Sequence, residues 1–474
     1  MEFQTISHAG LRVSASGKEL LCDPWLIGSA YWRSWWNYPP VPRALVDELR
    51  PDFIYLTHLH WDHFHAPSLR LFDPQIPVIV PYDRYGRMVR DLKAVGRKNI
   101  IELKNGERFE MAPDFALQSY HISPFVTDSA VIIEAEGQVL LNVNDAKFAG
   151  GPLNKILRRH PHIDFCFRSH SSANARNCYH YIDQDDELID DNEHYVRSFF
   201  LFMDRVRPRY AIPFASNNCF LHADTFAFNK LAQSPVNVAE YFQHAKQSSN
   251  MQTEIKLMIP GDSWSSQSGF ALQDHDYFSN REGQLAAYQA RVQPTLDRQA
   301  ATEAKANISL SAMQKFITTA KSKTPFFFML ALKNIEILIV ARNATQTKGF
   351  AVNLPKASVR EVEEEDFAAF DARIEFPAAI LMQSIRMNMF GHSAISKRVQ
   401  YYATPSAMPK LKRLVAIFDM LETEMLPLSG HLSRRAFAAM LPRWRELLLY
   451  INTVFEVLRG QSLPAIEQKF LKKH

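Results

Sequence analysis

The feature that most constrains this chain is a cluster of metal-binding residue types directly after one apolar stretch. Residues 53–57 read as a β-strand, and His58, His60, Asp62 and His63 follow in the order H-x-H-x-D-H. His58 and His60 are two residues apart, so at an extended strand end they point to one side and can bind one ion together. Asp62 and His63 lie where the chain must turn, and we expect them to face a second ion. Imidazole and carboxylate ligands fit zinc, iron or manganese and do not fit calcium.

Further ligand types end other predicted strands. His121 follows the strand 115–120, Asp145 ends the apolar run 139–145, and His222 follows the strand 209–213 after a short loop. In layered α/β folds, binding sites gather at the carboxyl ends of strands. These positions therefore complete a candidate site for two divalent ions.

We predict a specific division of these ligands between the two ions. His58, His60 and His121 bind the first ion, Asp62, His63 and His222 bind the second, and Asp145 bridges them. A water between the ions would have its pKa lowered toward neutrality and act as the nucleophile. We expect Asp62 to orient that water, so Asp62 and Asp145 are the catalytic candidates. Asp23, at the end of an early strand, is expected to orient a metal-bound histidine.

The length of 474 residues predicts more than one hydrophobic core. Residues 1–275 mix short strands with helices, which predicts an α/β domain of sheets covered by helices. Residues 276–312 read as a helical connector, and residues 313–474 as a smaller α+β domain with C-terminal helices. Strands are expected at 10–14, 18–23, 53–57, 77–81, 100–103, 115–120, 130–135, 138–143, 163–167, 209–213, 255–259, 325–332, 335–341, 347–353 and 372–376, and helices at 43–49, 66–72, 84–95, 193–206, 377–387, 408–424 and 433–459.

The ligand order resembles that of the metallo-β-lactamase superfamily over about residues 5–265, which implies an αββα sandwich. The segment Ser7-His8-Ala9-Gly10 is similar to the group that holds ascorbate-phosphate lactonase and N-acyl-phosphatidylethanolamine phospholipase D. The CMP-N-acetylneuraminate hydroxylase branch looks more similar still. It is suggested by Asp23-Pro24-Trp25-Leu26, Trp35-Trp36, Pro67-Ser68-Leu69, Asp128 after His121, the segment 140–145 and the segment 208–215 before His222.

One difference from the hydroxylase bears on the reaction. A Rieske cluster needs two Cys and two His in C-x-H and C-x-x-H pairs, and Cys22, Cys166, Cys178 and Cys219 have no such spacing. We therefore favour a dinuclear hydrolase acting on an ester, lactone, amide or phosphodiester. The alternative is a diiron oxygenase that receives electrons from an external donor.

Candidate substrate-binding residues lie on three loops. Trp35 and Trp36 are expected either to form an aromatic wall or to plug the core. Arg168 and Arg176 are expected either to hold an anion or to lie on a solvated loop, and Asn218 is a candidate donor. These residue types suit a small molecule with an apolar or ring portion and an anionic group.

Other features narrow the function classes. A net charge of +4 without a sustained Lys/Arg stripe gives no support for nucleic-acid binding. The apolar stretch 326–341 is too short and too polar to span a bilayer, and no signal-peptide pattern begins the chain, so we expect a cytoplasmic protein. The acidic segment 183–193 is expected to be a solvated helix start and loop. The C-terminal unit faintly resembles sterol-carrier domains, and we otherwise expect it to buttress the site or form a homodimer.

Overall fold

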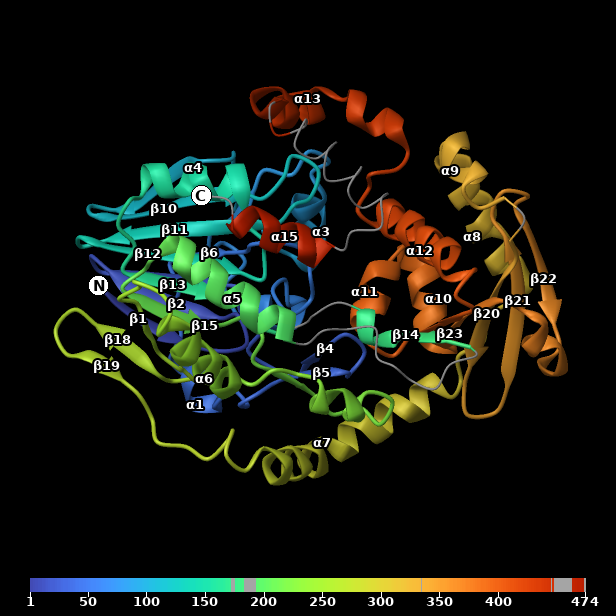
Figure 1. Ribbon diagram of the computed structural model, residues 1–474, viewed down its shortest axis with the longest axis horizontal. Helices are drawn as coiled ribbons and strands as arrows, with labels where there is room; N and C mark the ends of the chain where they lie inside the picture. The colour runs from blue at the N-terminus through green and yellow to red at the C-terminus, as the bar shows by residue number, and fades with distance from the viewer. Residues whose placement is uncertain (172–174, 183–192, 334, 445, 447–462, 473–474) are drawn as a thin grey trace.

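The computed structural model describes the chain except for residues 172–174, 183–192, 334, 445, 447–462 and 473–474 (Figure 1). Most of the acidic segment 183–193, and most of the helix expected at 433–459, therefore lie outside the described residues. No helix in the described part of the chain is long and apolar enough to cross a membrane.

Two sheets built from residues 2–271 form the first unit. The eight-stranded sheet has the order β19-β18-β1-β2-β3-β6-β7-β8, and the seven-stranded sheet has the order β17-β15-β13-β12-β11-β10-β9. In the first sheet the strands are β1 (Glu2–Thr5), β2 (Leu11–Ala15), β3 (Lys18–Cys22), β6 (Phe53–Tyr55), β7 (Val78–Pro81), β8 (Ile100–Leu103), β18 (Ser263–Ser265) and β19 (Gly269–Ala271). In the second they are β9 (Glu107–Ala112), β10 (Phe115–His121), β11 (Ser129–Ala135), β12 (Gln138–Asn144), β13 (Phe165–Arg168), β15 (Tyr210–Pro213) and β17 (Glu254–Ile255).

The sheets pack face to face and helices cover their outer faces. Phe3, Phe165 and Trp264 are buried in the core cluster shared by both sheets. The outer face of the seven-stranded sheet packs against α4 (Gly150–Arg159), α5 (Glu193–Val206) and α6 (Pro235–Lys246), and that of the other sheet against α1 (Arg43–Glu48), α2 (Ala66–Leu69) and α3 (Arg87–Val95). Strands covered on both faces carry few polar residues, as in β11, where six of seven residues are buried. The predicted αββα sandwich is confirmed.

The strand directions explain where the ligand loops lie. β3, β6, β7 and β8 are parallel neighbours, and so are β12, β13, β15 and β17. The carboxyl ends of parallel strands meet at one edge of a sheet. The loop after β6 and the residues after β12 therefore approach each other across the sandwich.

A third sheet forms the second unit, to the right in Figure 1. Its order is β14-β24-β23-β20-β21-β22, with β14 (Tyr179–Tyr181), β20 (Ile337–Arg342), β21 (Thr347–Asn353), β22 (Ser358–Val362), β23 (Ala372–Pro377) and β24 (Gln400–Ala403). It is accompanied by α8 (Leu310–Lys323), α10 (Ala378–Met387), α11 (Phe390–Ile395) and α12 (Met408–Glu422). The α+β character of this unit agrees with the prediction.

The two units share structure across the expected boundary. β14 lies at residues 179–181, yet it pairs in parallel with β24 of the C-terminal sheet. Trp25, Tyr31 and Trp35 belong to one buried cluster with the C-terminal helices. A small sheet of β4 (Ser29–Ala30), β5 (Trp35–Asn37) and β16 (Asn218–Phe220) supports these aromatic residues. The boundaries at 275 and 313 stay predictions, but the units do not have separate cores.

The connector and the tail fold partly as expected. Residues 276–312 contain the long helix α7 (Arg281–Glu303). The strand expected at 325–332 is wrong, because residues Phe326–Leu330 form the short helix α9 and leave Phe326 and Phe327 exposed. The apolar run there has no period of two, and Pro325 starts the helix. After α13 (Arg434–Met440), the chain returns to the first unit, where α15 (Leu463–Lys472) packs against α5 (Figure 1).

Candidate metal centre

The loop after β6 is held in place by a buried carboxylate. Thr57 donates through its backbone N–H to Asp23 Oδ1 at 2.9 Å and through its hydroxyl to Asp23 Oδ2 at 2.7 Å. Nδ1 of His63 lies 2.9 Å from Asp23 Oδ2, and the Asn144 amide also donates to that oxygen. Asp23 is completely buried. It therefore orients the His63 ring, as expected from the sequence.

His58, His60 and Asp145 form the first group of ligand atoms, all within 4.8 Å of one another. His58 Nε2 lies 2.8 Å from His60 Nδ1 and 3.8 Å from Asp145 Oδ2. Two nitrogens on a tetrahedral zinc ion would lie about 3.3 Å apart, given metal–nitrogen bonds of about 2.05 Å. The two rings are thus close to the separation that a shared ion needs.

His8, Asp62 and His63 form the second group. Asp62 Oδ2 lies 3.1 Å from His8 Nε2 and 3.3 Å from His63 Nε2. The Tyr31 hydroxyl donates to the other oxygen of Asp62 at 2.5 Å. All four side chains are buried. The second group is therefore more enclosed than the first, whose His60 and Asp145 are partly exposed.

Asp145 lies between the two groups. Its Oδ2 faces His58, and its Oδ1 is 3.6 Å from His63 Nε2. Both Asp145 Oδ1 and His63 Nε2 are buried without a hydrogen-bond partner among the described residues. Buried polar atoms are nearly always partnered, and a cation between these two atoms would satisfy both. The residues present therefore fit a metal ion on each side of Asp145.

The charged side chains of the two groups shift one another's pKa values. Burial alone would raise the pKa of Asp145, but His58 and His63 lower it to about 2. Burial is likewise outweighed at Asp62, where His63 and His8 hold the pKa well below its usual range. The three carboxylates Asp62, Asp145 and Asp23 raise the pKa of His63 against the effect of burial. The carboxylates are thus ionised and ready to bind cations, and at His63 a metal ion would bind in competition with a proton.

The first group is ready to bind without such a release. Burial lowers the pKa of His58, and burial together with His58 and His392 lowers the pKa of His60 to about 4. Both rings are therefore neutral at pH 7, the form that binds metals. Desolvation and Asp145 raise the pKa of nearby Asp128 to about 6, partly opposed by His60.

The C-terminal unit contacts the ligand loop and the tryptophan beside it through His392 and Gln383. The rings of His392 and His60 have centroids 5.5 Å apart, and His392 Nε2 lies 3.3 Å from the Leu59 carbonyl. Trp61 packs against Trp32 at 4.7 Å. Trp32 in turn donates from its indole to Gln383 Oε1 at 2.7 Å. These contacts are those that a buttressing unit would make, and the role of the C-terminal unit stays a prediction.

Two predicted ligands lie away from both groups. The His121 ring is influenced by Arg443 and Lys155, and its pKa is lowered to about 3 by burial and these cations. Nδ1 of His222 accepts from the Asp224 backbone at 3.2 Å. Neither ring joins a ligand group in the part of the chain that the structure describes. The metal-ligand roles of His121 and His222 therefore stay predictions, and the compact groups form without them.

The predicted substrate-binding tryptophans are packed in the interior. Trp35 is 1% exposed and donates to the Ile395 carbonyl at 3.1 Å, whereas Trp36 is 5% exposed and packs near α7. The two tryptophans therefore pack as a plug of the core and not as an exposed aromatic wall. Asn218 lies in β16, paired with Asn37.

Arg168 is buried, whereas Arg176 is partly exposed and its role stays a prediction. Arg168 is 1% exposed, and its Nη2 lies 2.5 Å from Glu467 Oε1 of α15. Its guanidinium carbon stacks 4.0 Å over the Phe202 ring. Arg176 lies in a short 3-10 helix (Arg176–Cys178). Burial and the positive charge of Arg176 lower the pKa of Lys412 in the C-terminal unit. Arg168 is therefore occupied by a carboxylate of the chain itself.

Sequence reasoning missed His8 and Asp128 as members of the site. Both lie in segments that indicate the resemblance, His8 in Ser7-His8-Ala9-Gly10 and Asp128 after His121, and neither is among the predicted ligands. His8 is 50 residues before His58, and nothing in the local pattern near it indicates a ligand. The available signal was the combination of a ligand-type residue with a turn directly after β1.

Comparison with known proteins supports the resemblance inferred from the motifs. No family model matches the chain. Cytidine monophosphate-N-acetylneuraminic acid hydroxylase of Asterias rubens is 31% identical over 152 residues, which is 31% of this chain and 23% of that protein. The Mus musculus hydroxylase is 29% identical over 153 residues, 31% of this chain and 26% of that protein. The matched segment thus spans about a quarter of these relatives, and less of this chain than residues 5–265.

Two solved structures align with part of this chain at lower sequence identity. The isothiocyanate hydrolase from Delia radicum gut bacteria is 14% identical with a TM-score of 0.41, covering 57% of this chain and 100% of that one. The metallo-beta-lactamase fold protein YhfI from Bacillus subtilis is 13% identical with a TM-score of 0.36, covering 56% of this chain and 98% of that one.

Proposed function

We propose that this protein is a dinuclear metal-dependent hydrolase of a small anionic ester, lactone, amide or phosphodiester. The observation that carries the proposal is the position of Asp145 between the groups His58/His60 and His8/Asp62/His63. A carboxylate in that place can bridge two ions, and two ions can activate a water and polarise an electrophile.

The protein residues have separate roles in this proposal. His58 and His60 hold one ion, and His8, Asp62 and His63 hold the other. Asp145 binds both, and the half-buried Asp128 is near enough to His60 to influence its charge. The Tyr31 hydroxyl and His8 fix the two oxygens of Asp62. Zinc, iron and manganese all suit this set of imidazoles and carboxylates.

A diiron oxygenase is the second candidate, favoured by the hydroxylase names of the curated relatives. Such an enzyme would need an electron donor, and we propose a separate protein for this role. The cytoplasmic location and the homodimer stay predictions.

Metal content and turnover test the proposal together. The purified protein should hold about two metal equivalents and hydrolyse 4-nitrophenyl acetate, a δ-lactone or bis(4-nitrophenyl) phosphate. Asp145→Asn should lose at least one equivalent and reduce hydrolysis roughly 10²-fold, the size typical for loss of one electrostatic group in an active site. Asp114→Asn is the matched control, because Asp114 is exposed on a turn with φ +58°, which Asn tolerates.

The outcome also separates the two candidates. Zinc-loaded protein with full hydrolysis supports the hydrolase. Protein that is inactive with zinc but consumes dioxygen when loaded with iron and given a reductant would establish the oxygenase instead. Unchanged metal content in Asp145→Asn would refute the bridging role in both.

A further inference from the structure

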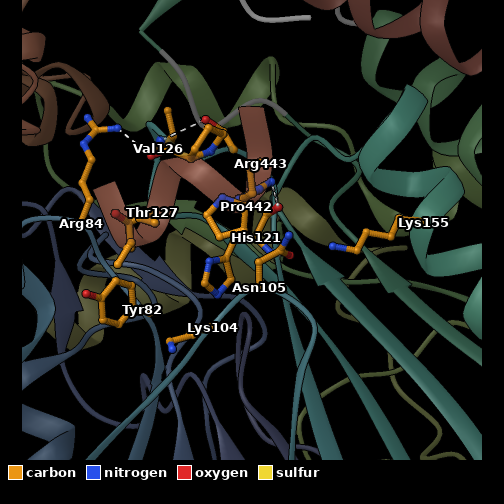
Figure 2. Close-up of a pocket in the computed structure, with 14 residues that line it drawn as sticks. Tyr82, Arg84, Lys104, Asn105, His121, Val126, Thr127, Lys155, Pro442 and Arg443 are labelled. Carbon is orange, nitrogen blue, oxygen red and sulfur yellow. Dashed lines mark hydrogen bonds between the residues drawn. The ribbon is translucent and has the colours of Figure 1, made fainter. Parts of the chain in front are cut away.

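A cavity of about 210 Å³ lies beside the metal centre and includes none of the two ligand groups among its described lining residues (Figure 2). Its walls come from the ends of β8 and β10, from α4, from the loop 122–127 and from the C-terminal turn that contains Pro442 and Arg443. Figure 2 shows His121 near its centre, with Lys155 approaching from α4 on one side and Arg84 on the other.

The described lining carries four cations and no carboxylate. The cations are Arg84, Lys104, Lys155 and Arg443. Arg443 is paired with Glu446, which accepts from its Nε at 2.8 Å and also from its Nη2, and Nη2 donates to the His121 carbonyl at 2.8 Å. The negative charge of Glu446 also raises the pKa of Lys155, and that of Glu424 raises the pKa of Arg84, each against the larger effect of burial. Neither carboxylate lines the cavity. Like charges that converge on one cavity repel unless an anion lies between them.

Several buried atoms of this cavity lack a partner. His121 is 8% exposed and its Nε2 has no hydrogen-bond partner among the described residues. Arg84 is 4% exposed and donates from Nη1 to the Pro124 carbonyl at 2.8 Å, while its guanidinium carbon lies 4.6 Å from the Tyr85 ring and 5.3 Å from the Phe125 ring. Its Nε and Nη2 have no hydrogen-bond acceptor in the same described set. Buried donors without acceptors are unfavourable, and a ligand oxygen would satisfy them.

The loop between this cavity and the metal centre is short. Thr127 lines the cavity, and the next residue, Asp128, acts electrostatically on His60. His121 itself is held neutral by burial and Arg443, so the positive charge comes from the arginines and lysines. The cavity is thus a separate cationic site, and Thr127 in its wall is followed directly by Asp128, which influences the ligand-group residue His60.

We propose that this cavity binds the phosphate group of a phosphate-bearing small molecule. A phosphate presents oxygens in several directions, which matches cations that approach from different walls, whereas a carboxylate presents two oxygens in one plane. The volume exceeds that of several water molecules at about 30 Å³ each. It is below the roughly 300 Å³ of a site for a whole drug-sized ligand, so the cavity accommodates the head group alone.

Phosphate titration of the full chain tests this site independently of the metal centre. Inorganic phosphate and phenyl phosphate are titrated calorimetrically into the purified protein with its metal ions and, in parallel, into protein from which a chelator has removed them. Wild-type protein should bind saturably at millimolar or lower concentration, and benzoate should bind at least tenfold more weakly. Lys104→Met and Lys155→Met should each weaken phosphate binding about tenfold, and the double variant further. Both lysines are at least partly exposed, so the variants should fold.

Lys93→Met is the control, because Lys93 is exposed on α3 and does not line the cavity. His121→Gln should weaken phosphate binding and keep the full metal content, which separates this role from that of a metal ligand. Equal phosphate binding by wild type and the lysine variants would overturn the inference. Phosphate binding that requires the metal ions would also overturn the inference, since the phosphate would then occupy the metal centre. Neither result would contradict the proposed hydrolase function.

Discussion

Replacing Asp23 by Asn should weaken metal binding although Asp23 is not a ligand. The carboxylate accepts hydrogen bonds from Thr57 N, Thr57 Oγ1, His63 Nδ1 and Asn144 Nδ2. An asparagine can keep one oxygen toward the Thr57 backbone, but it places an NH₂ group where Oδ2 was. That group donates, so His63 Nδ1 can pair with it only as an acceptor. The ring proton then moves to Nε2, the atom that faces Asp62 and Asp145.

The size of the effect follows from this change of tautomer. Loss of a carboxylate that orients a metal-bound histidine typically costs 10–100-fold in metal affinity, or about 1.4–2.8 kcal/mol. Asn144 also loses its acceptor, and an unsatisfied buried donor costs about 1–3 kcal/mol of folding stability. We therefore expect zinc affinity to fall by at least tenfold and the metal-free protein to unfold at lower urea.

Competition of the protein with a chromophoric chelator measures the zinc affinity, and urea denaturation measures the stability. Asp52→Asn is the control, because Asp52 also accepts from a backbone N–H and a side chain, Glu19 N at 2.9 Å and Lys18 Nζ at 2.8 Å, but lies partly exposed. If Asp23→Asn folds and binds zinc within twofold of wild type, then Asp23 does not set the His63 tautomer.

Two further predictions concern stability. Glu467→Gln removes the counter-charge of the Arg168 guanidinium, which is 1% exposed. Urea denaturation should then show a loss of about 3 kcal/mol in the free energy of unfolding, or hydrogen exchange should show that α15 detaches from the first unit. Wild-type values in both measurements would mean that other groups stabilise Arg168. Burial and Arg159 lower the pKa of His160 to about 4 from 6.5, so the unfolded chain binds the proton more readily and stability should fall as the pH drops from about 6.5 to about 4, with no contribution from this group above 6.5. His160→Gln should flatten that part of the curve of unfolding free energy against pH, and an unchanged slope would contradict the assignment.

Much of the sandwich could be predicted because its signals are local. Apolar runs bounded by turn residues give β8, β11 and β21 almost residue by residue, and α5 ends where its helical period does. The short strands β4, β5 and β16 escaped prediction, since two or three residues carry no period and depend on each other for pairing. The strand expected at 325–332 failed for a similar reason, because an apolar run without alternation does not distinguish strand from helix.

The sequence by itself determined the ligand loop from His58 to His63 and the carboxylate Asp145, because residue type and the end of a strand are local properties. Only the tertiary structure decided that His8 joins Asp62 and His63, since β1 and the loop after β6 are far apart in the chain. It also decided that Arg168 is paired with Glu467, nearly 300 residues later. His121 shows the same limit: the direction of its ring at the end of β10 depends on which groups pack around it, and these include Arg443 from the C-terminal turn. Ligand chemistry is thus encoded residue by residue, whereas side-chain direction and burial depend on elements that meet only when the chain has folded.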